Sequence, residues 1–182
     1  MPWDAPGSTA IVVLTPEAEP IAGEWYRLHS KAGAEGMRPH ITLLVPFVPA
    51  ERLDDDVEAR VRRVLQRFQP FDYTLERLER FEDGLLYLAP EPAHPFVELV
   101  SALAAEFPEY PRYDGEHDTI VPHGTVAASE DSDLLARIAA DVEPQLPLEC
   151  RVNDATLVER GADLRWRPRA SFPLGGGGLR RR

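Results

Sequence analysis

Apolar and polar positions follow two rhythms along this chain, and together they predict a mixture of strands and helices. The unbroken apolar run from Ala10 to Leu14 predicts a buried strand over residues 9–14. The Asp-Gly pair at 83–84 is a strong hairpin signal between two strand-like runs. Further strand-like patterns cover 40–45, 71–81, 85–88, a run that contains His123, 148–160 and 164–172, the last two closing the chain as a hairpin.

Apolar residues at helical spacing predict four helices between these strands. They cover 17–29, 53–68, 96–107 and 131–142. In the first, Ile21, Trp25 and Leu28 form the apolar stripe, and Gly33 and Gly36 are expected in the loop that follows.

The order strand, helix, strand, helix, hairpin occurs twice, which indicates an internal duplication. The segment Glu79-Arg80-Phe81-Glu82-Asp83 in the first predicted hairpin recurs as Glu159-Arg160-Gly161-Ala162-Asp163 in the second. We therefore expect repeats over about 8–80 and 84–172 within one bilobal domain, 1–174. The predicted class is α+β, with two pseudo-symmetric lobes, each an antiparallel sheet with helices on its outer face, and an active-site cleft between them.

The tripeptide His-x-Thr lies twice within an apolar strand pattern, at residues 40–42 and 123–125. Successive side chains of a strand point to opposite faces, so the histidine and threonine of each copy share one face. Ile41, Leu43 and Val45 are expected on the other face. The paired side chains are His40, Thr42, His123 and Thr125.

Two histidines brought together by an approximate two-fold axis could supply an acid and a base at once. Histidine has an ordinary pKa of about 6.5, so it can give or take a proton near neutral pH. This pair indicates cleavage of a phosphoester without a metal.

Composition narrows the classes of function. A net charge of -11 among 182 residues argues against binding of extended nucleic acid, which needs clustered positive charge. Cys150 is the only cysteine, so we expect no internal disulfide and a reducing compartment. With no apolar run long enough for a signal peptide or membrane span, we expect a cytoplasmic monomer that does not bind membranes, ending in a flexible Gly/Arg tail at 175–182.

The segments Pro39-His40-Ile41-Thr42-Leu43 and Pro122-His123-Gly124-Thr125-Val126 resemble the paired signatures of the two-histidine (2H) phosphoesterase superfamily. Its members include RNA 2',3'-cyclic phosphodiesterases, also called 2'-5' RNA ligase-like proteins. The resemblance covers about residues 8–172 but is specific only at the two motifs and over 40–47. Gly124 stands where a bulkier residue is common, and it would permit a close backbone approach.

This resemblance implies a phosphodiesterase without a cofactor that acts on a cyclic phosphate at an RNA end or on a small nucleotide. One of His40 and His123 would be the general base and the other the general acid, an assignment that the sequence leaves open. Thr42 and Thr125 would donate hydrogen bonds to the phosphate oxygens.

Other residues are weaker candidates for substrate contacts. Arg38 shares the strand parity of His40 and could anchor a phosphate. Tyr113 and His117 lie in the loop before His123 and could contact a base by stacking. The remaining histidines and two tryptophans are expected at helix ends, on the surface or in the core: His29, His94, Trp25 and Trp166.

Two rival functions and one related activity stay open. A zinc hydrolase could use both histidines as ligands, but there is no His-Glu-x-x-His pattern and no carboxylate of matching strand parity within either motif. A phosphate-binding module would use the same four side chains without turnover. Ligation of RNA ends is phosphodiester chemistry in reverse, and the sequence does not separate it from hydrolysis.

Overall fold

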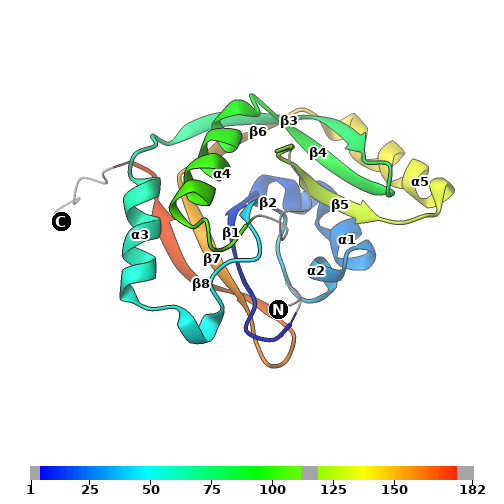
Figure 1. Cartoon of the computed structure of the whole chain (residues 1–182). Coiled ribbons are helices and arrows are strands. Elements are labelled where there is room, and N and C mark those ends of the chain that lie inside the picture. Colours follow the sequence, from blue (N-terminus) through cyan, green and yellow to red (C-terminus); the bar gives the residue numbers. More distant parts are fainter. Residues whose placement is uncertain (1–4, 112–118, 176–182) are drawn as a thin grey trace, which may run out of the picture.

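The computed structural model describes residues 5–111 and 119–175, and all its strands belong to one antiparallel sheet (Figure 1). The order of strands is β6-β3-β4-β5-β2-β1-β7-β8. Their bounds are β1 (Thr9–Leu14), β2 (His40–Leu44), β3 (Phe71–Arg80), β4 (Leu85–Glu91), β5 (Gly124–Ala128), β6 (Leu148–Val152), β7 (Asp154–Arg160) and β8 (Trp166–Pro173).

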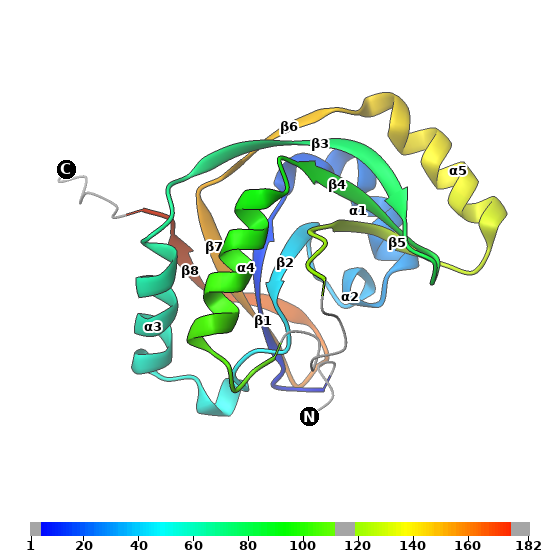
Figure 2. The same ribbon diagram turned by 45° about the horizontal axis from the view of Figure 1, so that its top comes forward.

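The sheet consists of two groups of four strands that meet where β5 pairs with β2. One group is β2-β1-β7-β8 and the other is β5-β4-β3-β6. Figure 2 shows β3, β4 and β5 crossing the upper part of the view, while β1 and β2 run steeply below them. The predicted α+β class with two antiparallel lobes is confirmed.

Each group of strands combines both halves of the chain. β3, which comes from the first predicted repeat, pairs with β4, the first strand of the second repeat. In the same way β7 pairs with β1. The lobes are therefore interlocked by exchanged strands, while the repeat boundaries themselves stay a prediction.

One predicted strand, 148–160, is divided at Asn153. The part before it is β6, which pairs with β3, and the part after it is β7, which pairs with β1. The single-strand prediction is wrong because an alternating pattern reveals which face is buried but not which neighbour supplies the hydrogen bonds. The chain crosses between the lobes at this break.

All four predicted helices are present, and the described residues also include the short helix α2 and three 3-10 helices. Two of the predicted helices have aspartate caps at the N-terminus: Asp54 accepts a hydrogen bond from the Val57 N–H at 2.9 Å, and Asp131 accepts from the Leu134 N–H at 3.1 Å. The helices are η1 (Pro16–Ala18), α1 (Glu19–His29), α2 (Lys31–Ala34), η2 (Ala50–Arg52), α3 (Asp55–Leu65), α4 (His94–Glu106), α5 (Ser132–Val142) and η4 (Glu143–Gln145).

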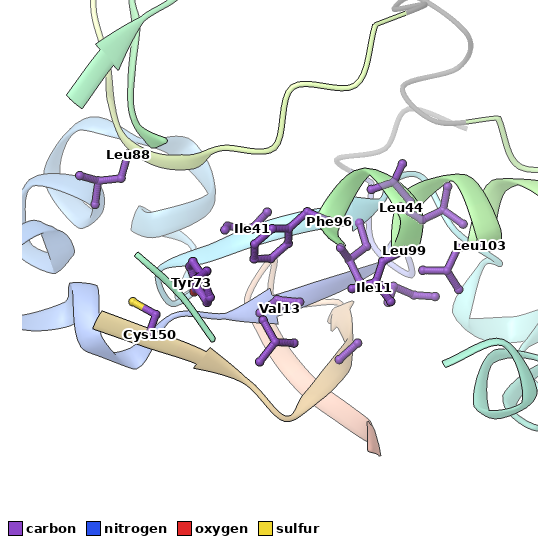
Figure 3. Packing of buried hydrophobic residues seen from close by; sticks show 14 of the residues in the cluster. Ile11, Val13, Ile41, Leu44, Tyr73, Leu88, Phe96, Leu99, Leu103 and Cys150 are labelled. Carbon is purple, nitrogen blue, oxygen red and sulfur yellow. The ribbon is translucent and has the colours of Figure 1, made fainter. Parts of the chain in front are cut away.

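The main core lies between one face of the sheet and the helices. Figure 3 shows Phe96, Leu99 and Leu103 of α4 beside Ile11 and Ile41 of β1 and β2. Each of these five residues is fully buried. Since side chains alternate along β2, the face opposite Ile41 is the one that carries the histidine and threonine.

The packing of α1 differs from its predicted apolar stripe. Leu28 is 64% exposed, and the buried positions are Ala22, Gly23 and Tyr26. Small residues allow this helix to approach the sheet closely, whereas the large side chains had suggested a different face. Trp25 is only partly buried, and its Nε1 donates to Asp141 Oδ2 of α5 at 2.8 Å.

Gly33 lies in α2 rather than in a loop. A Cβ at this position would lie 2.2 Å from the backbone oxygen of Tyr26, so α2 can pack against α1 only with glycine there. Of the remaining predicted positions, His29 ends α1, His94 begins α4, and Trp166 is buried, as expected.

Candidate active site

The two His-x-Thr copies meet where the two halves of the sheet join. Ile41 of β2 is paired with Gly124 of β5 in an antiparallel register. One residue to either side, this register sets His40 opposite Thr125 and Thr42 opposite His123. The two histidines lie on a diagonal of the ladder, where neighbours are about 7–8 Å apart.

All four side chains line one cavity of about 770 Å³. A cavity of this size suits a nucleotide-sized ligand. Its other lining residues come from β1, α1 and α2, from the segments after α2 and β2, and from the start of β8. They also come from the β3–β4 turn, the start of β4, β5 and the segment before β5.

The same hydrogen bond orients both imidazole rings. Nδ1 of His40 lies 2.8 Å from the backbone oxygen of Arg38, and Nδ1 of His123 lies 2.7 Å from that of Val121. A carbonyl oxygen only accepts, so each Nδ1 carries the hydrogen. Each Nε2 is therefore the ring nitrogen without a hydrogen in the neutral form, and it is the atom that can accept a proton.

The surroundings of His40 favour its neutral form. The pKa of His40 is lowered to about 4, chiefly by burial and also by the nearby charge of His123, against the hydrogen bond to the Arg38 carbonyl, which raises it. The ring of Tyr26 stands edge-on at 6.1 Å, and burial raises the pKa of that phenol. His40 is thus unprotonated at neutral pH and able to accept a proton.

His123 is packed against two aromatic rings. The centroid of Phe81 lies 5.3 Å away at 89°, and that of Tyr87 lies 5.6 Å away at 66°. Phe81 and Tyr87 stack on one another at 4.3 Å. The Tyr87 hydroxyl donates a hydrogen bond to Glu79 at 2.9 Å. Burial, and to a smaller extent this hydrogen bond, raises the pKa of Tyr87 to about 12.

A buried ion pair fixes the α2 side of the cavity. Arg160 donates to both oxygens of Glu35, at 2.9 and 2.6 Å, and its side chain is only 4% exposed. The Trp166 N–H also donates to the Glu35 carbonyl at 2.9 Å. These bonds tie α2 to the β7–β8 hairpin, and α2 supplies Lys31, the one lysine or arginine among the described residues that line the cavity.

Not every sequence-predicted residue reaches the cavity. Arg38 is exposed and does not line it, although its carbonyl holds His40. Tyr113 and His117 lie outside the described residues.

Two local expectations about the motif strands are wrong. Val45 lines the cavity instead of facing away from it, because β2 ends at Leu44 and the alternation stops there. The close backbone approach expected at Gly124 is not there, since an added Cβ would be 3.7 Å or more from its neighbours, an ordinary contact.

Sequence reasoning missed several residues around the histidines. Tyr26 was hidden because α1 turns a different face inward than its large apolar residues suggested. Phe81 and Glu82 could have been found from the repeat itself, where the second copy has Gly161 and Ala162.

Two wider searches of the described residues gave negative results. No three histidine, cysteine, aspartate or glutamate side chains within 5–111 and 119–175 are grouped so as to hold a metal ion. Within the same ranges, none of the helices has the length and apolar character required to cross a membrane.

A family model described as the 2'-5' RNA ligase superfamily matches residues 14–164. The chain belongs to this superfamily. The resemblance to the 2H phosphoesterases that the paired motifs indicate is thereby confirmed. A comparison with curated proteins gave no significant match.

Solved structures support the fold of this superfamily member. The protein TT0787 of Thermus thermophilus is 22% identical with a TM-score of 0.62, covering 94% of this chain and 100% of that one. E. coli LigT complexed with 3'-AMP is 18% identical with a TM-score of 0.58, covering 93% and 99%. LigT complexed with NADP+ is also 18% identical, with a TM-score of 0.54 and coverage of 93% and 98%. At these identities the likeness establishes the fold.

Proposed function

We propose that this protein is a metal-independent phosphodiesterase that hydrolyses a 2',3'-cyclic phosphate, or a related phosphodiester, of RNA ends or small nucleotides. The observation that carries the proposal is the pair of histidines on one cavity, each with Nδ1–H bonded to a backbone carbonyl, which makes Nε2 the basic nitrogen of the ring. Thr42 and Thr125, on the same cavity, are the proposed donors to the phosphate.

In the proposed reaction, Nε2 of one histidine takes a proton from water as the water oxygen bonds to phosphorus. The bond from phosphorus to one ribose oxygen breaks, and Nε2 of the other histidine gives that oxygen a proton. Each role is typically worth about 10² to 10⁴ in rate. The threonine hydroxyls donate to the non-bridging oxygens, on which negative charge builds in the transition state.

His40 is the proposed base and His123 the proposed acid. The lowered pKa of His40 leaves it unprotonated in the free protein, as a base must be. A phosphate anion in the cavity adds negative charge beside both rings and favours a proton on one of them. Because His40 is biased toward its neutral form, we assign the proton of the pair to His123.

Relatives with this fold support a nucleotide ligand. Solved structures show E. coli LigT complexed with 3'-AMP, with phosphate and with NADP+. The cavity of about 770 Å³ has room for a ligand of that class.

The test is a substrate panel assayed with and without a chelator. It includes the four 2',3'-cyclic nucleotides, short RNAs with cyclic ends and ADP-ribose cyclic phosphate. We expect turnover that the chelator does not change. Loss of turnover on chelation would indicate a metal enzyme, and retained binding without turnover would indicate a binding module.

Ligation is tested in the same assay by adding an RNA with a free 5'-hydroxyl. The description of the superfamily supports including this acceptor. In ligation the hydroxyl replaces water as the nucleophile on the cyclic phosphate, and the same two histidines serve as base and acid. A joined product would extend the proposed activity to ligation.

A further inference from the structure

Two equivalent hairpin turns have the same internal hydrogen bonds. In turn 81–84 and turn 161–164, the first residue's N–H donates to the carbonyl four positions on, at 2.9 Å in both. The fourth residue's N–H donates back to the carbonyl of the first, at 3.1 and 3.0 Å. The aspartate at the third position accepts from the N–H two positions on, at 3.2 Å in both. The scaffold of the turn is thus the same in the two copies.

The first two side chains of these turns differ, and only one turn faces the cavity. Phe81 and Glu82 occupy positions that hold Gly161 and Ala162 in the other copy. Residues of turn 81–84 line the cavity, whereas none of turn 161–164 does. No side chain at these two positions takes part in the shared turn hydrogen bonds, so the aromatic ring and the carboxylate are additions to the scaffold.

Both additions are placed to contact a ligand. Phe81 is stacked on Tyr87 at 4.3 Å and stands edge-on to His123, and it is partly exposed on the cavity wall. Glu82 is exposed and makes no hydrogen bond or ion pair with residues 5–111 or 119–175. A carboxylate only accepts hydrogen bonds, so it favours a group with N–H donors.

We propose that Phe81 and Glu82 form a base subsite that selects nucleobases presenting N–H donors on their pairing edge. This inference rests on the proposed function, since it names the substrate group bound beside His123. The base would pack on Phe81 and donate to Glu82. Guanine offers two adjacent N–H donors to the two carboxylate oxygens, and adenine and cytosine each offer an exocyclic amine. The single N–H of uracil lies between two carbonyl oxygens, which the carboxylate repels.

The subsite also breaks the approximate two-fold symmetry of the paired motifs. The equivalent turn of the second copy carries glycine and alanine in place of Phe81 and Glu82, and it does not line the cavity. A nucleotide held by its base at turn 81–84 therefore binds in one orientation. That single orientation gives the two histidines different partners on the substrate.

The experiment compares kcat/KM for the four 2',3'-cyclic nucleotides in the wild-type protein and in Glu82→Ala. Alanine is the residue that the second turn carries at this position, so the turn should still form, which a thermal melt checks. We expect the wild type to prefer guanosine over uridine by about 5- to 150-fold, the range for one good carboxylate–base contact. In Glu82→Ala this ratio should approach one.

Two further variants sharpen the result. Glu82→Gln offers both a donor and an acceptor, so it should restore uridine relative to guanosine. Glu51→Ala removes the same charge from an exposed side chain off the cavity, and its ratio should match the wild type. A ratio that is the same in the wild type and Glu82→Ala overturns the subsite.

A binding titration with 3'-GMP and 3'-UMP distinguishes failure of the proposed function from failure of the subsite. Selective binding of 3'-GMP that is lost in Glu82→Ala, in a protein without turnover, supports the subsite and contradicts only the catalytic proposal. Equal binding of the two nucleotides, or binding of neither, overturns the subsite.

Discussion

Ile41 and Gly124 face each other across β2 and β5, and this is the pairing that joins the two halves of the sheet. Their own side of the sheet belongs to the core, where Ile41 is fully buried. The residues on either side of the pair point to the opposite face, which is the cavity. One backbone pairing thus positions both histidines and both threonines.

The threonines should contribute less than the histidines. Thr42→Val and Thr125→Val keep the shape of the side chain but remove the hydroxyl. Because a hydrogen bond to a charged group is worth about 1.5–3 kcal/mol, each should lower kcat/KM by about 10- to 100-fold. The matched variants Thr42→Ser and Thr125→Ser keep the hydroxyl and should stay within a few-fold of the wild type. Equal losses in the valine and serine variants would contradict the donor role.

The acid limb of the pH profile should reflect the lowered pKa of His40. In kcat/KM this limb reports the base of the free enzyme, which must be unprotonated to act. With the pKa of His40 at about 4, activity should persist as the pH falls through the ordinary histidine value of about 6.5 and decline only near pH 4. Circular dichroism at each pH checks that the protein remains folded. An acid limb centred near 6.5 would show that His40 is not the base.

Breaking the buried ion pair should destabilise the protein strongly. Arg160→Ala leaves Glu35 without its partner beside the cavity, and loss of one member of a buried pair costs about 3 kcal/mol or more. The control is Arg169→Ala, which removes a pair with Glu159 whose side chains are 35% and 32% exposed and should cost less than about 1 kcal/mol. Urea unfolding measures both. Similar losses in the two variants would contradict the structural role given to Arg160.

At the fourth position of the two equivalent turns, a glycine and a larger side chain should have opposite effects on stability. Leu164 has φ 62° and is 45% exposed, a backbone conformation that costs a non-glycine residue about 1–2 kcal/mol. Glycine brings its own entropy cost of about 0.5–1 kcal/mol, so Leu164→Gly should stabilise the protein by up to about 1 kcal/mol.

Gly84→Ala should destabilise the protein instead. Gly84 has φ +87°, and an added Cβ would lie 2.3 Å from the Ser129 backbone oxygen. Thermal melts of both variants test this contrast. A stabilising alanine at 84 would show that the backbone there differs from the one described.

Local patterns in the sequence predicted most elements and the four histidine and threonine side chains that line one cavity. The helical spacing of apolar residues over 53–68 predicted the helix that the structure shows as α3. The alternation around His40 predicted its strand and the face that it shares with Thr42. These features can be predicted because the apolar residues within each segment repeat with the period of a helix or of a strand.

The remainder depends on contacts between distant segments. The division of 148–160 into β6 and β7 depends on which strands lie beside each part. The face of α1 depends on the distant segments that bury Ala22 and Tyr26, and the positions of the large apolar residues in the helix do not indicate them. The tautomer of each histidine depends on the backbone carbonyl that faces its Nδ1, and the sequence pattern does not show where that carbonyl points.

The most direct test of the account is the rate of 2',3'-cyclic nucleotide hydrolysis, with a chelator present, in the wild type, His40→Ala, His123→Ala and the double variant. Because proton transfer by each ring is worth about 10² to 10⁴, each single variant should lose at least about 100-fold in kcat while remaining folded. The double variant should lose little more than the worse single one, since the two rings act as a unit. Full activity in either single variant would contradict the central claim that His40 and His123 together transfer the protons.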